Sequence, residues 1–174
     1  EPPCLNTMLV CGGMAAAGMM TAPMWDSFIS IDDKGQHFPL MATEIPTTEN
    51  GGVVTENGKM VVKMGIKDEA HWSDNVPVTC DDLVFTWQTI MSDKWQIGSR
   101  LGWDQIDTIE CPTPKQIVVR FAKPYAPYLG VVGTAPLPKH DLEGKDFNTY
   151  LNAGAPVSSG PFVFAYWKRN VEYV

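Results

Sequence analysis

The chain has 174 residues, of which 44% are hydrophobic and 19% charged, a balance typical of a globular protein long enough to bury a core. Its formal net charge of −7 argues against nucleic-acid binding, because a nucleic-acid interface needs a basic face. The apolar runs fall short of the roughly 20 residues that a membrane-spanning helix needs. Residues 1–3 carry no secretory signal pattern, so we expect the chain either to begin at a mature terminus or to have been cut here.

Short elements are predicted in the first part of the chain. We expect a strand over residues 4–10, a break at Gly12-Gly13, and a helix over residues 14–20. Four methionines lie in and after that helix. We interpret them as core-filling side chains rather than soft-metal ligands, because no Cys or His joins them at a regular spacing. A strand, with or without a short helix before it, should occupy residues 24–31 and end at a turn over residues 32–35.

The dipeptide Asn57-Gly58 is a strong hairpin signal, because both residues tolerate positive φ. It lies between two runs rich in β-forming residues, 53–55 and 59–66. In the second run, alternate residues from Met60 to Met64 should face the core, as in a half-buried strand.

Residues 69–87 hold the most specific local pattern. Thr79 is a strong helix N-cap, and Asp82 three residues later can complete a capping box. An apolar stripe at helical spacing then predicts a packed helix. The stripe consists of Leu83, Val84, Trp87, Ile90 and Met91. In the turn before the cap, Trp72 should bury its ring and find a partner for its indole N–H, and Asn75 suits a positive φ.

The second half of the chain alternates between strands and short helices after a loop over residues 93–102. The expected elements are strands over 105–111 and 116–121, short helices over 128–132 and 146–151, and a closing hairpin of 162–168 with 171–174.

The four cysteines, Cys4, Cys11, Cys80 and Cys111, leave three disulfide pairings or none open. Cys4–Cys11 and Cys80–Cys111 bridges are reasonable in an exported protein, and buried free thiols are an equal alternative. No CxxC spacing is present to support a zinc site.

The segment from Trp72 to Trp87 resembles the signature of the extracytoplasmic solute-binding proteins of the oligopeptide and dipeptide class, the binding components of ABC importers. The family pattern runs W-S-D-G-x-P-V-T-A-x-D-V-x-F-[ST]-W. The matching residues are Trp72, Ser73, Asp74, Pro77, Val78, Thr79, Asp82, Phe85 and Trp87. Asn75 stands where Gly is usual, and Cys80 where Ala is usual. Phrases similar to the family's also occur, in family order, over residues 32–46, 136–140 and 158–162.

The resemblance implies a mixed α/β fold of the periplasmic-binding-protein-like II type, in which two large lobes close on a ligand and a smaller domain is inserted in the first lobe. Residues 1–26 would open the first lobe, residues 27–151 would form the inserted domain, and residues 152–174 would return to the first lobe as a hairpin. The second large lobe would be absent. We therefore expect a fragment that self-associates through its open C-terminal strand.

The resemblance also implies a function: capture of a peptide-like or similar solute in the periplasm or at the cell surface, and delivery to an ABC permease in the membrane. The loop of Gly12, Gly13 and Met14 and the turn of Ser158, Ser159 and Gly160 would face the cleft, where backbone groups could bind an extended peptide. Trp95 and Trp103 are expected in loops and could contact a ligand. The alternative is a standalone carbohydrate- or peptide-binding module with a pocket near these two indoles.

No pattern in the chain supports catalysis. The three histidines, His37, His71 and His140, lie far apart without metal-ligand spacing, and there is no GxSxG elbow. Cys80 could be paired with His71 as a nucleophile, but Cys80 falls at the start of a packed helix. We therefore expect no enzyme activity, no cofactor and no bound metal.

Overall fold

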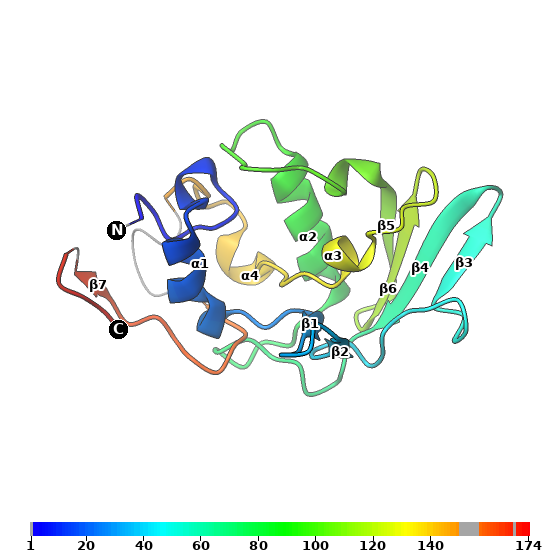
Figure 1. Ribbon diagram of the computed structural model, residues 1–174, viewed down its shortest axis with the longest axis horizontal. Coiled ribbons are helices and arrows are strands. Elements are labelled where there is room, and N and C mark those ends of the chain that lie inside the picture. Colours follow the sequence, from blue (N-terminus) through cyan, green and yellow to red (C-terminus); the bar gives the residue numbers. More distant parts are fainter. Residues whose placement is uncertain (1, 150–156, 169) are drawn as a thin grey trace.

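The main structural unit is a four-stranded antiparallel sheet in the order β3-β4-β6-β5 (Figure 1). The computed structural model describes residues 2–149, 157–168 and 170–174. The strands of the sheet are β3 (Val53–Glu56), β4 (Lys59–Gly65), β5 (Ile106–Thr113) and β6 (Gln116–Phe121). Within the described ranges, no helix has both the length and the apolar character to cross a bilayer.

The hairpin of β3 and β4 turns at Asn57 and Gly58, as predicted. Their φ angles of 52° and 77° are the positive values that a two-residue hairpin turn requires. Met60 and Met64 are buried as expected. Val61, between them on the opposite side of the strand, is also fully buried, so β4 is covered on both sides at this point.

Helix α2 (Cys80–Met91) packs against β5 and contributes to the main core (Figure 1). Thr79 and Asp82 form the predicted capping box. From the apolar stripe, Leu83 and Ile90 are buried, whereas Met91 at the end of the helix is exposed.

Thr86 is a polar residue on the buried face of α2, which an apolar pattern could not reveal. Its side chain is fully buried and its hydroxyl is satisfied twice. The hydroxyl donates to the carbonyl of Asp82 at 2.6 Å and accepts from the amide of Leu137 at 2.8 Å. The helix is thereby tied to the segment that precedes α4 (Lys139–Leu142).

The predicted strand over residues 4–10 is wrong. Among the described residues, Leu9 makes only an isolated bridge to Ile97, and a short 3-10 helix, η1 (Val10–Gly12), follows it. The Cys4–Cys11 disulfide holds its two Cα atoms 5.6 Å apart, whereas an extended segment between them would span about 20 Å. The segment must therefore fold back as a loop.

Both expected disulfides, Cys4–Cys11 and Cys80–Cys111, are formed, and no free cysteine remains. The alternative of buried free thiols is therefore wrong, and so is the pairing of Cys80 with His71 as a nucleophile, because the sulfur of Cys80 is bonded to Cys111.

The remaining elements are short. The predicted first helix is α1 (Ala15–Thr21), and the turn between β1 and β2 places Gly35 at a φ of 78°. Residues 147–149 of the helix expected over 146–151 are a turn, and residues 150 and 151 lie outside the described residues. The other elements are η2 (Ala22–Met24), β1 (Ile29–Ile31), β2 (His37–Pro39), η3 (Trp103–Gln105), α3 (Leu129–Val132), α4 (Lys139–Leu142), β7 (Trp167–Lys168) and β8 (Glu172–Tyr173).

The molecule is elongated, with the four-stranded sheet at one end and α1 with the β7–β8 hairpin at the other (Figure 1). The closing hairpin is present as predicted but shorter, since its strands are two residues each. The predicted site residues lie mainly toward the α1 end.

Candidate ligand-facing site

The loop that enters α1 presents two of the three residues predicted there. Gly13 is exposed, and Met14, the N-cap of α1, is 48% exposed. Gly12 is buried, and a Cβ atom at its position would lie 1.9 Å from the carbonyl oxygen of Asn6. Gly12 therefore serves close packing, while Gly13 and Met14 remain available to a ligand.

Trp95 lies beside this loop because the neighbouring backbones are bonded to each other. The amide of Val10 donates to the carbonyl of Gln96 at 2.9 Å, and the amide of Gly98 donates to the carbonyl of Met8 at 2.8 Å. The ring of Trp95 is half-buried, 6.3 Å from that of Phe147. The structure thus brings Trp95 close to the start of α1.

Trp103 does not share that position, and its expected place in a loop is wrong. It begins the 3-10 helix η3, is only 9% exposed and belongs to the main core. Trp95 instead packs against a separate cluster. The pocket expected near both indoles is therefore not supported, because one ring is committed to the core.

The turn of Ser158, Ser159 and Gly160 joins two distant parts of the chain. The amides of Ser159 and Gly160 both donate to the carbonyl of Met24, at 3.1 and 2.8 Å. Ser158 is fully buried and exchanges hydrogen bonds with Ser73, at 3.1 and 2.7 Å. These amides are thus already bonded within the protein, so they cannot donate to an added peptide strand.

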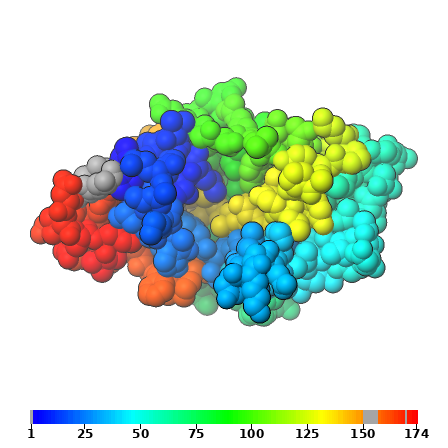
Figure 2. All heavy atoms as spheres, viewed as in Figure 1, coloured from blue at the N-terminus to red at the C-terminus, as the bar shows by residue number. Residues whose placement is uncertain are grey.

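A cavity of about 370 Å³ separates the N-terminal loop and α1 from residues 134–137. Figure 2 shows the blue N-terminal part and the yellow part of the chain flanking this region of the surface. None of the described residues that line the cavity is ionisable. Its lining consists of Asn6, Thr7, Met8, Gly18, Thr21, Ala22, Trp25, Thr134, Ala135, Pro136 and Leu137.

A smaller polar pocket of about 180 Å³ lies beside Ser159. Its ionisable lining residues are Asp26, Lys67, Glu69 and His71. Partial burial raises the pKa of Asp26 above its usual value, because desolvation disfavours the charged form. Within the part of the chain that the structure describes, no three His, Cys, Asp or Glu side chains are grouped closely enough to hold a metal ion.

The signature turn before α2 is organised by the buried carboxylate of Asp82. This carboxylate accepts hydrogen bonds from the amides of Thr79 at 2.8 Å and Lys139 at 2.9 Å, and from the indole of Trp72 at 3.4 Å. Trp72 is buried and its N–H has the partner that we predicted. Asn75 has a φ of 69°, which explains why it can stand where Gly is usual. The segment therefore has a clear role in stabilising the fold.

Comparison with known proteins assigns the chain to a class. Residues 38–174 match the description "Bacterial extracellular solute-binding proteins, family 5 Middle", and the chain belongs to this family. It is a family of solute-binding transport proteins rather than a class of enzymes, and its description places its members outside the cytoplasm. The Trp72–Trp87 signature segment agrees with this assignment.

Two curated relatives illustrate the similarity. An oligopeptide-binding protein, OppA, of Mycobacterium tuberculosis is 29% identical over 181 residues, covering 99% of this chain and 29% of the relative. A probable monoacyl phosphatidylinositol tetramannoside-binding protein, LpqW, of the same species is 33% identical over 121 residues, covering 67% of this chain and 19% of the relative. The chain thus spans less than a third of either relative.

Solved structures share the fold. An oligopeptide-binding protein from Thermus thermophilus, complexed with a pentapeptide, has a TM-score of 0.74 at 23% identity, covering 95% of this chain and 33% of that one. NikZ from Campylobacter jejuni, in complex with Ni(L-His), has a TM-score of 0.78 at 21% identity, covering 97% and 32%. The predicted mixed α/β fold of the periplasmic-binding-protein-like type is confirmed.

Proposed function

We propose that this chain is part of a solute-binding protein that captures a peptide-like solute outside the cytoplasm and delivers it to an ABC permease. The observation that carries the proposal is the family match over residues 38–174. Gly13, Met14 and Trp95 are the residues that we place against the solute. The names of the OppA and AppA relatives, both called oligopeptide-binding proteins, support a peptide as the solute.

The proposal includes a division into domains: residues 27–151 form an inserted domain, and residues 1–26 and 152–174 belong to the first large lobe. An inserted domain needs its entry and exit side by side. In support, the backbone amide of Asp26 donates a hydrogen bond to the hydroxyl of Ser159 at 3.0 Å, although the two residues are 133 positions apart. The bonds from Ser159 and Gly160 to Met24 support the same crossing point.

The chemistry of the site supports a neutral, partly apolar ligand portion. The described lining of the cavity beside α1 contains no ionisable side chain, and Met14 and Val10 are exposed at this end of the molecule. Methionine adapts its shape to different partners, which suits recognition of varied peptide side chains. Charged groups of a solute would need partners outside the cavity beside α1.

The test is isothermal titration of the protein, as its gene encodes it, with short peptides, with maltotriose and with a nickel–histidine chelate. We expect binding of peptides only. Met14→Ala and Trp95→Ala should weaken peptide binding, whereas Met91→Ala, an exposed methionine at the end of α2, should not. Binding of maltotriose or the chelate without any peptide would overturn the proposed solute, and equal affinity in all variants would overturn the proposed contact residues.

A further inference from the structure

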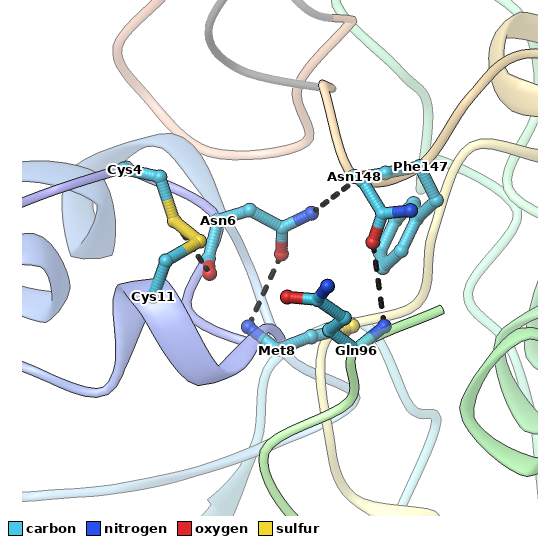
Figure 3. The surroundings of a disulfide bond; sticks show 7 residues. All are labelled: Cys4, Asn6, Met8, Cys11, Gln96, Phe147 and Asn148. Carbon is cyan, nitrogen blue, oxygen red and sulfur yellow. Dashed lines mark hydrogen bonds between the residues drawn. A yellow bond between two sulfur atoms is a disulfide. The ribbon is translucent and has the colours of Figure 1, made fainter. Parts of the chain in front are cut away.

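The Cys4–Cys11 disulfide closes a loop that carries one side of the proposed solute site (Figure 3). The loop is firmly anchored, because Cys4, Leu5 and Leu9 are buried. Cys11 is followed directly by Gly12, where an added Cβ atom would lie 1.9 Å from the carbonyl oxygen of Asn6 within the loop. The path of residues 12–14 therefore depends on how the loop is closed.

Asn6 organises the interior of this loop. It is only 3% exposed, and its side-chain carbonyl accepts from the amide of Met8 at 3.1 Å. Its side-chain amide donates to the carbonyl of Phe147 at 3.3 Å, so the loop is also tied to a turn far along the sequence (Figure 3). The ring of Phe147 is the one on which Trp95 packs.

The same loop holds the segment of residues 95–98. Val10 and Gly98 donate their amides across the two backbones, and Leu9 and Ile97 form a β-bridge. On the other side, the amide of Gln96 donates to the side chain of Asn148 at 3.3 Å (Figure 3). The disulfide-closed loop thus lies between Met14 and Trp95 and contacts the backbone of both segments.

We infer that the Cys4–Cys11 disulfide is a positioning element of the solute site: it sets the distance between the start of α1 and the Trp95 segment. This inference rests on the proposed function. Without the bond, residues 4–11 gain conformational freedom, and binding must then order the loop as well as the ligand. The expected consequence is weaker solute binding by a protein that is still folded.

The test compares two double variants of the protein as its gene encodes it. Cys4→Ser/Cys11→Ser removes the positioning disulfide, and Cys80→Ser/Cys111→Ser removes the bond between α2 and β5 as a matched control. We expect peptide affinity to fall about tenfold in the first variant, because loop ordering opposes binding, and to stay within about twofold in the control. The Cys80–Cys111 bond closes the longer loop, so its removal should destabilise the fold more. If general destabilisation were the cause of weaker binding, the Cys80→Ser/Cys111→Ser control would therefore lose more peptide affinity than the first variant.

Hydrogen exchange without ligand gives a readout that does not depend on solute binding. The amides of Val10 and Gly98 should exchange faster in the first variant only. If the parent protein binds no peptide but these amides respond as expected, the proposed function fails and the positioning of the loop stands. If the amides do not respond, or if both variants lose affinity equally, the inference is overturned. Should the first variant not fold, selective reduction of the folded protein at Cys4–Cys11 allows the same two measurements.

Discussion

Asp82 is the one charged residue that is buried among the described residues. It is 3% exposed, and its two carboxylate oxygens accept from Thr79, Lys139 and Trp72. In Asp82→Asn, one oxygen becomes an NH₂ group that faces an N–H donor. We expect the free energy of unfolding to fall by about 3 kcal/mol, because a buried donor loses a charged acceptor. Urea unfolding followed by circular dichroism measures this change.

The neighbouring carboxylate of Asp81 provides the control. Its side chain is 66% exposed, and its nearest cation, the Nζ atom of Lys139, is 4.0 Å away. Asp81→Asn should lower the free energy of unfolding by less than about 1 kcal/mol, since an exposed ion pair and a helix-end charge contribute little. Equal losses in the two variants would contradict the role assigned to Asp82.

The surroundings of Asp74 predict that the stability of the fold depends on pH. Partial desolvation would raise the pKa of Asp74, but hydrogen bonds from His140, at 2.8 Å, and from the amide of Val76 outweigh it, so the pKa lies below its usual value of 3.8. The carboxylate of Asp74 therefore takes up a proton more readily in the unfolded chain than in the folded protein. The contribution of the Asp74 carboxylate to the stability of the folded protein is fully present above pH 3.8, the pKa of Asp74 in the unfolded chain. It is lost as the pH falls through the lower pKa of Asp74 in the folded protein.

The measurement is acid unfolding of the parent protein and of Asp74→Asn. We expect the variant to lose less stability than the parent protein as the pH drops below 3.8. Asp33→Asn, which changes an exposed carboxylate in the β1–β2 turn, should follow the parent curve. A variant curve for Asp74→Asn that is parallel to the parent curve would show that the Asp74–His140 contact is not maintained in solution.

The two disulfides act on different elements and should differ in their effect on stability. Cys80–Cys111 joins α2 to β5 across a sequence separation of 31, and Cys4–Cys11 spans a separation of 7. Chain-entropy arguments predict losses of about 3.7 kcal/mol for removal of the first and about 2.5 kcal/mol for removal of the second. Urea unfolding of the two double-serine variants would test the order. A larger loss from the Cys4–Cys11 variant would mean that the N-terminal loop stabilises the core beyond its own closure.

Elements whose stabilising partners are close in sequence could be predicted, and the others could not. The β3–β4 turn needs only Asn57 and Gly58, and the start of α2 needs only Thr79 and Asp82. The strand expected over residues 4–10 does not form. A disulfide and a distant partner at Ile97 determine its actual path, and neither is evident in a local pattern.

The candidate site shows the same limit. Resemblance to a family pointed to Gly13 and Met14, which are exposed, but it also pointed to the turn at Ser158. The amides of that turn bond to Met24 and Ser73, and such contacts between distant segments appear only in the folded chain. Trp103 likewise gave no local sign of burial, because the strands and helices that cover it come from other parts of the sequence.

At the scale of the whole molecule, the end that carries the β7–β8 hairpin is unusually apolar. Among the described residues, β7 and β8 pair only with each other. The exposed large apolar side chains at this end are Phe162 (64%), Val163 (57%), Tyr166 (46%), Val171 (67%) and Val174 (51%). An unpaired strand edge beside apolar side chains favours pairing with another chain.

We therefore predict that this 174-residue chain, produced alone, forms dimers or larger assemblies. Size-exclusion chromatography with light scattering over a range of concentrations would measure the mass. Phe162→Ser/Val171→Ser should shift the assemblies toward monomer, because it removes apolar surface from the hairpin end. Leu101→Ser changes a side chain that is 79% exposed in another part of the molecule and should leave the mass distribution unchanged. A parent chain that stays monomeric at every concentration would contradict the prediction, and so would an equal response to the two variants, because association would then depend on exposed apolar surface in general and not on the hairpin.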